Sequence, residues 1–191
     1  MDPVATTDRL TLREWGEGDE ARFYAAMNAP AVMRWLGGVQ TPAQWHEASL
    51  RLIDYQRDLG HTFWLVERRS DGDLLGFCGL KRVNAPGAPM PGAMEIGWRL
   101  REAAWGQGFA KEAATAALDL AFTRFAAEEV VALTVIGNSA SWGLMERLGM
   151  QRRRDLDYDD TRFAIGSEFR PHIVYSMAAA DWPAARAQAI A

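Results

Sequence analysis

The sequence predicts an α/β protein in which a mixed sheet carries helices on both faces, and three observations predict it. Short apolar stretches with period-two alternation or β-branched runs indicate strands along much of the chain. Stretches with helical spacing separate these strands, and a prominent one begins at Phe109. Strands before and after that helix can pair side by side with the helix as their crossover, which places helices against the sheet.

The N-terminal part of the chain indicates a strand followed by a helix. Residues 9–15 alternate between polar and apolar side chains, with both leucines on one face, as in a half-buried strand. Asp19 is expected to cap a helix whose body covers residues 21–27. Pro30 either ends this helix or opens a short second one.

A longer helix follows, and both of its ends carry sequence signals. Thr41-Pro42 places a capping residue before a proline in the first turn. Gly60 is expected to end the helix. Between these ends, side chains recur at helical spacing at Trp45, Ser49, Leu52, Ile53 and Gln56.

The next segment predicts three strands and a loop. Residues 63–69 and 74–83 indicate two strands, and Asp71-Gly72 between them is a tight-turn signal, so together they predict a hairpin. Residues 84–92 hold three prolines and two glycines, which predicts a loop. Residues 93–100 form the third apolar strand.

From Phe109 onward the chain alternates helices with strands. Residues 129–135 indicate a buried strand, residues 139–148 a shorter helix, and residues 172–177 a final strand. The tail after Asp181 is rich in alanine and is either helical or loose. The helix that begins at Phe109 has one apolar stripe, formed by Phe109, Ala113, Ala117, Leu118, Ala121, Phe122 and Phe125.

Length and charge limit the class of protein. The 191 residues are enough for one domain with a hydrophobic core and too few for two comfortable ones. The net charge of −4 gives no footprint for general nucleic-acid binding, which needs clustered Lys and Arg. The one basic cluster, residues 152–154, is followed at once by aspartates between positions 155 and 160, so its field largely cancels.

Cysteine content and hydropathy favour a cytoplasmic protein. The single cysteine, Cys78, excludes an intrachain disulfide and a cysteine-rich metal site, and its apolar neighbours indicate a buried strand position rather than a reactive thiol. The first eight residues lack the basic and apolar regions of a secretory signal. No apolar stretch approaches the roughly 20 residues of a membrane helix, so no membrane partner is expected.

The segment from Glu95 to Ala113 carries the clearest chemical signal. It predicts a strand, a turn that contains Gly106 and Gly108, and the start of a helix. Small residues let a ligand approach the backbone, and the helix offers free N–H groups and the positive end of its dipole, which suits a pyrophosphate. These features alone also fit a nucleotide loop or a plain strand-to-helix turn. The Gly-Lys-Ser/Thr of a Walker loop is absent, and a dinucleotide fold would place its glycines after the first strand.

This segment resembles the acetyl-CoA motif of the GNAT superfamily of N-acetyltransferases, usually Gln/Arg-x-x-Gly-x-Gly/Ala. The matching stretch is residues 105–110, in which Trp105 stands where Gln or Arg is usual. The form with tryptophan is familiar in the Rim-type, ribosomal-protein-alanine acetyltransferase-like branch of the superfamily, which this chain therefore resembles. Residues 7–13, 95–100 and 138–150 resemble other segments of that branch in the same order. The resemblance, over about residues 7–178, implies one GNAT domain across 1–191, with a mixed, mostly antiparallel sheet of six to seven strands.

The resemblance also implies acetyl-CoA as co-substrate and no metal. The backbone groups of Trp98, Arg99 and Leu100 would pair with the pantetheine arm like an extra strand, and one N–H would polarise the thioester carbonyl. Asn138 would hydrogen-bond the pantetheine. The backbone N–H groups from Gly106 to Lys111 would hold the pyrophosphate. The cofactor-binding motif as a whole would comprise Trp105, Gly106, Gln107, Gly108, Phe109, Ala110 and Lys111.

The implied reaction is direct attack of a neutral amine on the acetyl carbonyl, which needs a base and a proton for the departing thiolate. Glu95 is the candidate base; a water chain that takes the proton and a salt-bridged strand-end carboxylate are the alternatives. Many GNAT enzymes protonate the thiolate with a Tyr of the last helix, but Met145 holds that position here. Ser141 is therefore the candidate donor, and a helix-start serine bonded to the backbone is the alternative.

The acceptor is left open between a protein N-terminus and a small amine. His172 either reaches the acceptor site or is a satisfied histidine. A polyamine or aminoglycoside acceptor would favour an acidic pocket. The acidic residues of 155–160 and Glu168 either supply this pocket or belong to a solvated loop. Aromatic surface for an acceptor pocket near the N-terminal helices is offered by Trp35, Trp45, Trp64 and Trp142.

Two other functions remain open from the sequence. Because Met145 replaces the tyrosine, a non-catalytic protein that binds acetyl-CoA as a sensor is the second possible function. The presence of Asn138 and Ser141 argues against a sensor. A transferase for a longer acyl-CoA would need a wider channel. No nucleic-acid partner is expected, and a homodimer is compatible with the sequence.

Overall fold

The computed structural model describes residues 2–190, the side chain of Ile190 excepted. Within them lie nine β-strands and six α-helices. The chain forms two compact units, each built from separate stretches of sequence. Unit 1 consists of residues 1–81 and 97–117, and unit 2 of residues 82–96 and 118–191. Strand β5 (Met94–Leu100) begins in unit 2 and ends in unit 1, and helix α4 (Phe109–Thr123) does the reverse.

Unit 1 contains a series of antiparallel strands. β1 (Ala5–Thr6) pairs with β2 (Leu10–Arg13), β2 with β3 (Phe63–Arg68), and β3 with β4 (Asp73–Arg82). Both leucines of β2 are fully buried, as the alternation predicted. β3 and β4 form the predicted hairpin, and Gly72 in its turn has a φ of 70°, a value that favours glycine.

The last residues of β5 lie against β4 within unit 1. The N–H of Arg101 donates to the carbonyl of Leu75 at 2.9 Å. Gly76 has a φ of 150°, and a Cβ at its position would overlap the carbonyl oxygen of Arg99. The glycine therefore permits the close approach of the two strands directly beside Arg99.

The helices of unit 1 are α1 (Asp19–Met27), α2 (Pro30–Met33), α3 (Pro42–Leu59) and the first part of α4. Both predicted ends of α3 are confirmed. The Thr41 hydroxyl accepts the Gln44 N–H at 3.3 Å, and the Gln44 side chain accepts the Thr41 N–H at 2.8 Å, which forms a capping box. Gly60 holds the C-cap with a φ of 71°.

The prediction that Asp19 caps α1 is wrong. Gly18 holds the N-cap position and Asp19 is the first helical residue. The Asp19 carboxylate pairs with Arg13 at 2.6 Å and accepts the N–H of Gly16 at 2.8 Å. A charged guanidinium makes a stronger hydrogen bond than a helical N–H, so the ion pair takes the carboxylate away from the cap.

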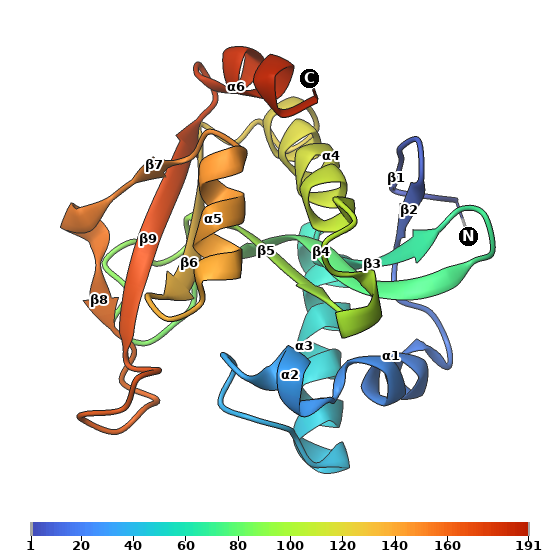
Figure 1. Cartoon of the computed structure of the whole chain (residues 1–191), viewed down its shortest axis with the longest axis horizontal. Coiled ribbons are helices and arrows are strands. Elements are labelled where there is room, and N and C mark those ends of the chain that lie inside the picture. Colours follow the sequence, from blue (N-terminus) through green and yellow to red (C-terminus); the bar gives the residue numbers. More distant parts are fainter. Residues whose placement is uncertain (1, 191) are drawn as a thin grey trace. The chain divides into compact units, whose positions relative to one another are not determined.

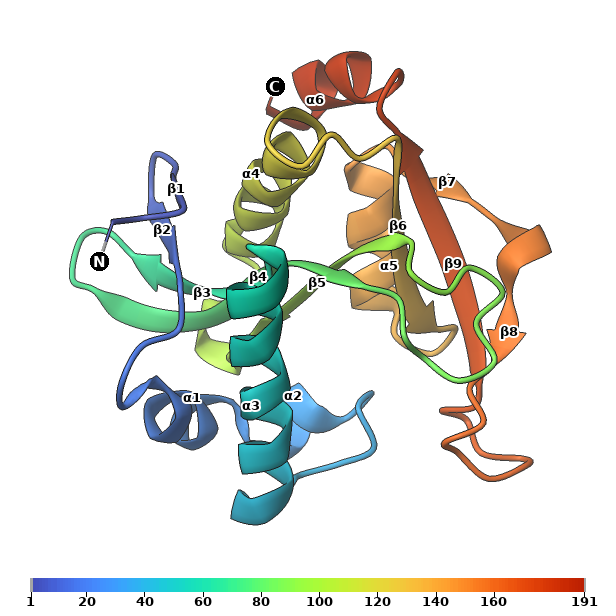
Figure 2. The same cartoon turned by 180° about the vertical axis from the view of Figure 1, so that it is seen from behind.

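Aromatic rings fill the core of unit 1. Phe23 of α1 stacks on Trp45 of α3 and on Phe77 of β4, with centroid distances of 4.9 Å and 5.3 Å. Trp15 tilts against Phe23 at 5.2 Å. Figures 1 and 2 show α3 on one face of β3 and β4 and the beginning of α4 on the other. Unit 1 is thus a sheet with helices on both faces, as predicted.

Unit 2 contains the other strands. The first residues of β5 pair in parallel with β6 (Glu129–Val135), with Met94 opposite Val130. β9 (Pro171–Ala178) pairs with β6 in antiparallel fashion, and the short strands β7 (Gln151–Arg152) and β8 (Tyr158–Asp159) pair with β9 in the same sense. The parallel pair confirms that the strands before and after the Phe109 helix lie side by side.

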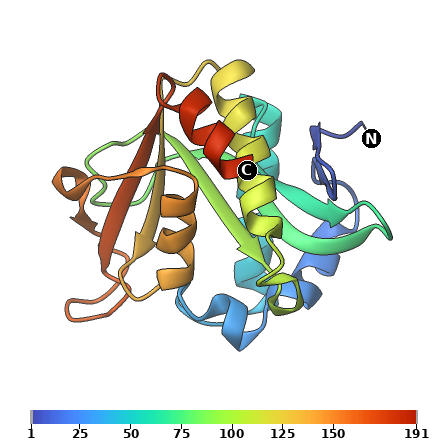
Figure 3. The ribbon, with the colours of Figure 1, turned by 45° about the horizontal axis from the view of Figure 1, so that its top comes forward.

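The helices of unit 2 are α5 (Ser139–Arg147), α6 (Trp182–Ile190) and the last residues of α4. Figure 3 shows α6 beside this end of α4. The indole N–H of Trp182 donates to Asp119 at 2.8 Å, and its ring lies 6.0 Å from that of Phe122. The alanine-rich tail is therefore helical. Helix α4 ends at Thr123, so Phe125, which was predicted to belong to the apolar stripe of this helix, lies beyond its end.

The predicted α/β class with mostly antiparallel strands is confirmed, because every described strand pairing except that of β5 with β6 is antiparallel. Six strands, β2 to β6 and β9, have four residues or more. The sequence missed β1, β7 and β8, because two residues cannot show an alternation. Cys78 is fully buried, and burial raises the pKa of its thiol. None of the helices in residues 2–190 is long and apolar enough to cross a membrane.

Candidate functional site

The glycine-rich turn has the geometry expected of an anion site. Gly106 and Gly108 have φ values of 72° and 80°, which only glycine adopts without strain. The Glu112 N–H donates to the Gly108 carbonyl at 3.0 Å and makes the first hydrogen bond of α4. The N–H groups of residues 109–111 therefore precede the hydrogen-bonded ladder of the helix and point from its positive end.

Arg9 of unit 1 braces this turn, a role that the sequence did not predict. Its guanidinium donates to the Gln107 carbonyl at 2.9 Å, pairs with Glu112 at 2.7 Å, and lies 4.5 Å from the ring centroid of Phe109. Burial alone would raise the pKa of Glu112, but hydrogen bonds from Thr7 and Arg9 lower it. The first turn of α4 is thus tied to the N-terminal strand by a charged pair.

The tryptophan that departs from the usual motif has a structural role. The indole N–H of Trp105 donates to the Leu100 carbonyl at 2.8 Å, and the Gln107 side chain donates to the Ala103 carbonyl at 2.7 Å. The first bond connects the turn to the end of β5, and the second connects it to the short 3-10 helix Glu102–Ala104. Trp105 remains 47% exposed, so its ring is also open to contact.

The segment Trp98–Leu100 lies in the part of β5 that belongs to unit 1. One edge of this segment approaches β4 beside Gly76. Within the described residues of unit 1, its other edge has no strand partner. Such an edge can accept an extended chain as an added strand.

The structure places Glu95 in unit 2, buried to 9% exposure, in the β5 segment that pairs with β6. Burial and the neighbouring charge of Glu95 raise the pKa of the Tyr158 hydroxyl. This hydroxyl is buried and has no hydrogen-bond partner among the residues described. His172 stacks on Tyr158 at 5.2 Å, and burial lowers the pKa of its imidazole. Sequence reasoning missed Tyr158, because its neighbours come from strands far along the chain.

Asn138 and Ser141 lie together at the start of α5 in unit 2. Asn138 holds the N-cap position, its amide donates to the Thr134 hydroxyl at 3.2 Å, and its carbonyl accepts the N–H of Ser141 at 3.0 Å. The partly buried Ser141 hydroxyl makes no hydrogen bond to any part of the chain that the structure describes. Met145, which stands at the position of the expected tyrosine, is 1% exposed.

The predicted site residues thus form two groups, each within one unit. Unit 1 holds the turn and the β5 segment, and unit 2 holds Glu95, Asn138 and Ser141. Over residues 2–190, no cluster of His, Cys, Asp and Glu side chains could hold a metal ion.

The aspartates between positions 155 and 160 are each paired with an arginine. Asp160 is fully buried beneath Arg162, although the latter side chain is 60% exposed. The ion pairs of this segment are Arg153–Asp155, Arg152–Asp157, Arg170–Asp159 and Arg162–Asp160. Each of these negative charges therefore has a positive partner beside it.

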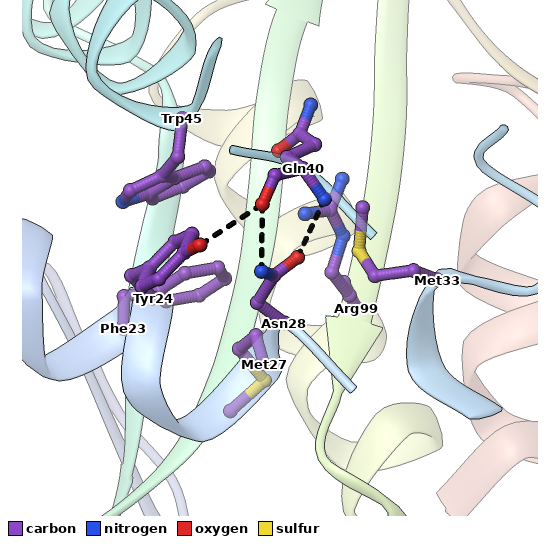
Figure 4. Close-up of a pocket in the computed structure, with 8 residues that line it drawn as sticks. All are labelled: Phe23, Tyr24, Met27, Asn28, Met33, Gln40, Trp45 and Arg99. Carbon is purple, nitrogen blue, oxygen red and sulfur yellow. Dashed lines mark hydrogen bonds between the residues drawn. The ribbon is translucent and has the colours of Figure 1, made fainter. Parts of the chain in front are cut away.

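Unit 1 contains a small pocket between its N-terminal helices and β5 (Figure 4). Among the four tryptophans expected at an acceptor pocket, Trp45 alone lines it, and Trp64 is fully buried. The pocket has an accessible volume of about 10 Å³, the room for about one water molecule. Its walls are Phe23, Tyr24, Met27, Asn28, Met33, Gln40, Trp45 and Arg99.

Comparisons with known proteins agree with this architecture. The family model described as "Acetyltransferase (GNAT) domain" matches residues 9–151. The uncharacterised protein YkkB of Bacillus subtilis is 32% identical over 145 residues, which cover 75% of this chain and 83% of YkkB.

Two solved structures share the fold. The ribosomal-protein-S5-alanine acetyltransferase of Vibrio fischeri has a TM-score of 0.71 at 17% identity, over 93% of this chain and 97% of the other. The spermidine N-acetyltransferase of Vibrio cholerae, in complex with CoA and spermine, has a TM-score of 0.71 at 18% identity, over 93% and 99%. At these identities the likeness concerns the fold.

Proposed function

Because the chain belongs to the GNAT acetyltransferase family, we propose that it is an N-acetyltransferase that moves the acetyl group of acetyl-CoA directly to an amine. The observation that carries this proposal is the strand, turn and helix start from Trp98 to Lys111. It combines a β5 edge at Trp98–Leu100 that has no strand partner among the described residues of unit 1, two glycines in the left-handed region and free helical N–H groups. An extended arm can add to the strand edge and a pyrophosphate can bind at the helix N-terminus, so these features together suit a cofactor that has both.

The residues of unit 1 are proposed to bind the cofactor. The N–H groups of Gly106 to Lys111 hold the pyrophosphate, and Arg9 keeps the turn in position through Gln107. The β5 edge at Trp98, Arg99 and Leu100 hydrogen-bonds the pantetheine arm, and one N–H polarises the acetyl carbonyl. In unit 2 the Asn138 side chain hydrogen-bonds the same arm.

The residues of unit 2 are proposed to move the protons. Acetyl-CoA supplies an activated acyl group, and its C–S bond breaks as the new C–N bond forms. Glu95 takes a proton from the attacking amine, directly or through water. Ser141 donates a hydrogen bond or a proton to the departing thiolate, and its unengaged hydroxyl supports this role.

A non-catalytic acetyl-CoA sensor is the second candidate function, and the buried Met145 favours it. The Rim-type branch would make a protein N-terminus the acceptor, and a small amine is the other choice. A polyamine is disfavoured, because arginines neutralise the aspartates of residues 155–160.

The test is acceptor-dependent release of thiol from acetyl-CoA across N-terminal peptides, amino acids, polyamines and aminoglycosides. Glu95→Gln and Ser141→Ala should each lower kcat by about 10²-fold or more while acetyl-CoA binding in calorimetry stays unchanged. Glu128→Gln and Ser139→Ala, at exposed positions, are the matched controls. Binding without release for every acceptor would support the sensor, and absence of binding would refute both functions.

A further inference from the structure

Arg99 carries a guanidinium that its own protein leaves without a polar partner. Its Nε is inaccessible to solvent and has no hydrogen-bond partner among the described residues. Its one described side-chain interaction is with the ring of Phe77, at 5.0 Å from the centroid. Burial lowers the pKa of Arg99 to about 10, so the group is still charged at neutral pH. Arg99 as a whole is half-buried and only its Nε is sealed from solvent, so the other guanidinium N–H groups can meet a counterion that a ligand brings from outside.

The ring of Phe77 does not replace such a counterion. A cation over an aromatic face gains some attraction, but the in-plane N–H groups of the guanidinium still need acceptors. The same ring already stacks on Phe23 and Phe63, so it belongs to the aromatic core of unit 1. The stacking therefore positions the guanidinium and leaves its donors available.

The side chains of Tyr24 and Asn28, which share the pocket with Arg99, are already engaged with the backbone of Gln40. The Tyr24 hydroxyl and the Asn28 amide both donate to the Gln40 carbonyl at 2.9 Å, and the Gln40 N–H donates to Asn28 at 2.8 Å (Figure 4). Figure 4 shows Arg99 on the β5 side of the pocket and the rings of Trp45 and Tyr24 across from it. The pocket lining includes no Asp or Glu.

We propose that this pocket binds a carboxylate carried by the acceptor amine, with Arg99 as its cationic partner. The planar guanidinium matches a carboxylate with two parallel hydrogen bonds, which selects it over a neutral amide. Its accessible volume of about 10 Å³ is the room for about one water molecule, so only the carboxylate end of an acceptor could enter it and the rest would lie outside. The acceptor class is therefore an amino acid or a similar amine with a carboxylate.

This inference rests on the proposed acetyl transfer and narrows it. Arg99 lies between Trp98 and Leu100, whose backbone is proposed to hold the pantetheine arm. Because side chains alternate along a strand, Arg99 projects opposite to these two neighbours. One short segment would then bind the cofactor through its backbone and the acceptor through a side chain. A polyamine, which has no anionic group, would meet an uncompensated positive charge.

The experiment compares α- and ω-amino acids with their carboxamides, which keep the amine and lose the charge. Thiol release from acetyl-CoA gives kcat and KM, and calorimetry without acetyl-CoA gives binding of the same compounds. In the natural protein the free acid should have a KM at least about tenfold below that of its amide. Arg99→Met should abolish this preference chiefly through KM, and Arg99→Lys should restore part of it. Arg51→Met, at an exposed position of α3, is the matched control.

The outcomes separate this inference from the proposed function. Arg99-dependent binding of free acids without thiol release would support the carboxylate site and refute the transferase. Thiol release with equal KM for acids and amides, or a preference that survives in Arg99→Met, would overturn the carboxylate site and leave the transferase intact. Absence of both binding and release would overturn both.

Discussion

Two arginines of unit 1 lie over aromatic rings in opposite electrostatic settings. Arg9, at the glycine-rich turn, lies 4.5 Å from the Phe109 centroid and is also bonded to Gln107 and Glu112. Arg99, at the pocket, lies 5.0 Å from the Phe77 centroid and has no polar partner among the described residues. A cation whose partners belong to the fold stabilises it, whereas an unpaired one adds stability only when a ligand arrives.

The largest expected loss of stability comes from a substitution in β4, where this strand contacts β5 at Arg99. Gly76→Ala should lower the free energy of unfolding by more than about 3 kcal/mol, because its Cβ would overlap the backbone of Arg99 and force β5 away from β4. Gly72→Ala, with a similar requirement for positive φ but open space around it, should cost only about 1 kcal/mol. Denaturant unfolding of both variants measures the difference. Equal losses would show that β5 tolerates displacement at Arg99.

The next effect contrasts the two arginines directly. Arg99→Met should raise the free energy of unfolding by at most about 1 kcal/mol, because it replaces a half-buried cation that has no polar partner among the described residues with an apolar side chain. Arg9→Met should lower it by about 1–2 kcal/mol, because it leaves Glu112 and the Gln107 carbonyl without their partner. Thermal and denaturant unfolding without ligand measure the sign of the change in unfolding free energy for both variants. Destabilisation by both substitutions would mean that Arg99 is a structural residue like Arg9.

The smallest effect is a pH dependence at the turn. The pKa of Glu112 lies below its ordinary 4.5, so its pairing stabilises the fold above that value and is lost as pH falls through the lower, folded pKa. Glu112→Gln should therefore cost about 1 kcal/mol near pH 7 and progressively less toward pH 3. Unfolding at several pH values tests this, with exposed Glu47→Gln as control. A difference that does not change with pH would show that the charge of Glu112 has no role.

Much of the fold could be predicted because its signals are local. Thr41, Pro42 and Gln44 define the start of α3 within one turn of helix, and the β-branched run of β6 has the predicted bounds. The glycines of the turn were also found, because positive φ is a property of single residues. The prediction for Asp19 was wrong although its signal was local, since Arg13 competed successfully for the carboxylate.

The sequence by itself determined the order of strands and helices, the glycine-rich turn and the resemblance to a family. Tertiary structure alone decided which charges are neutralised. Arg9 meets Gln107 and Glu112 across about a hundred residues, whereas Arg99 meets an aromatic wall from α1, α3 and β4 that holds no carboxylate. The physical reason is that dihedral preferences and periodicity act over a few residues. The partner and the burial of a charge depend on segments that only the folded chain brings together.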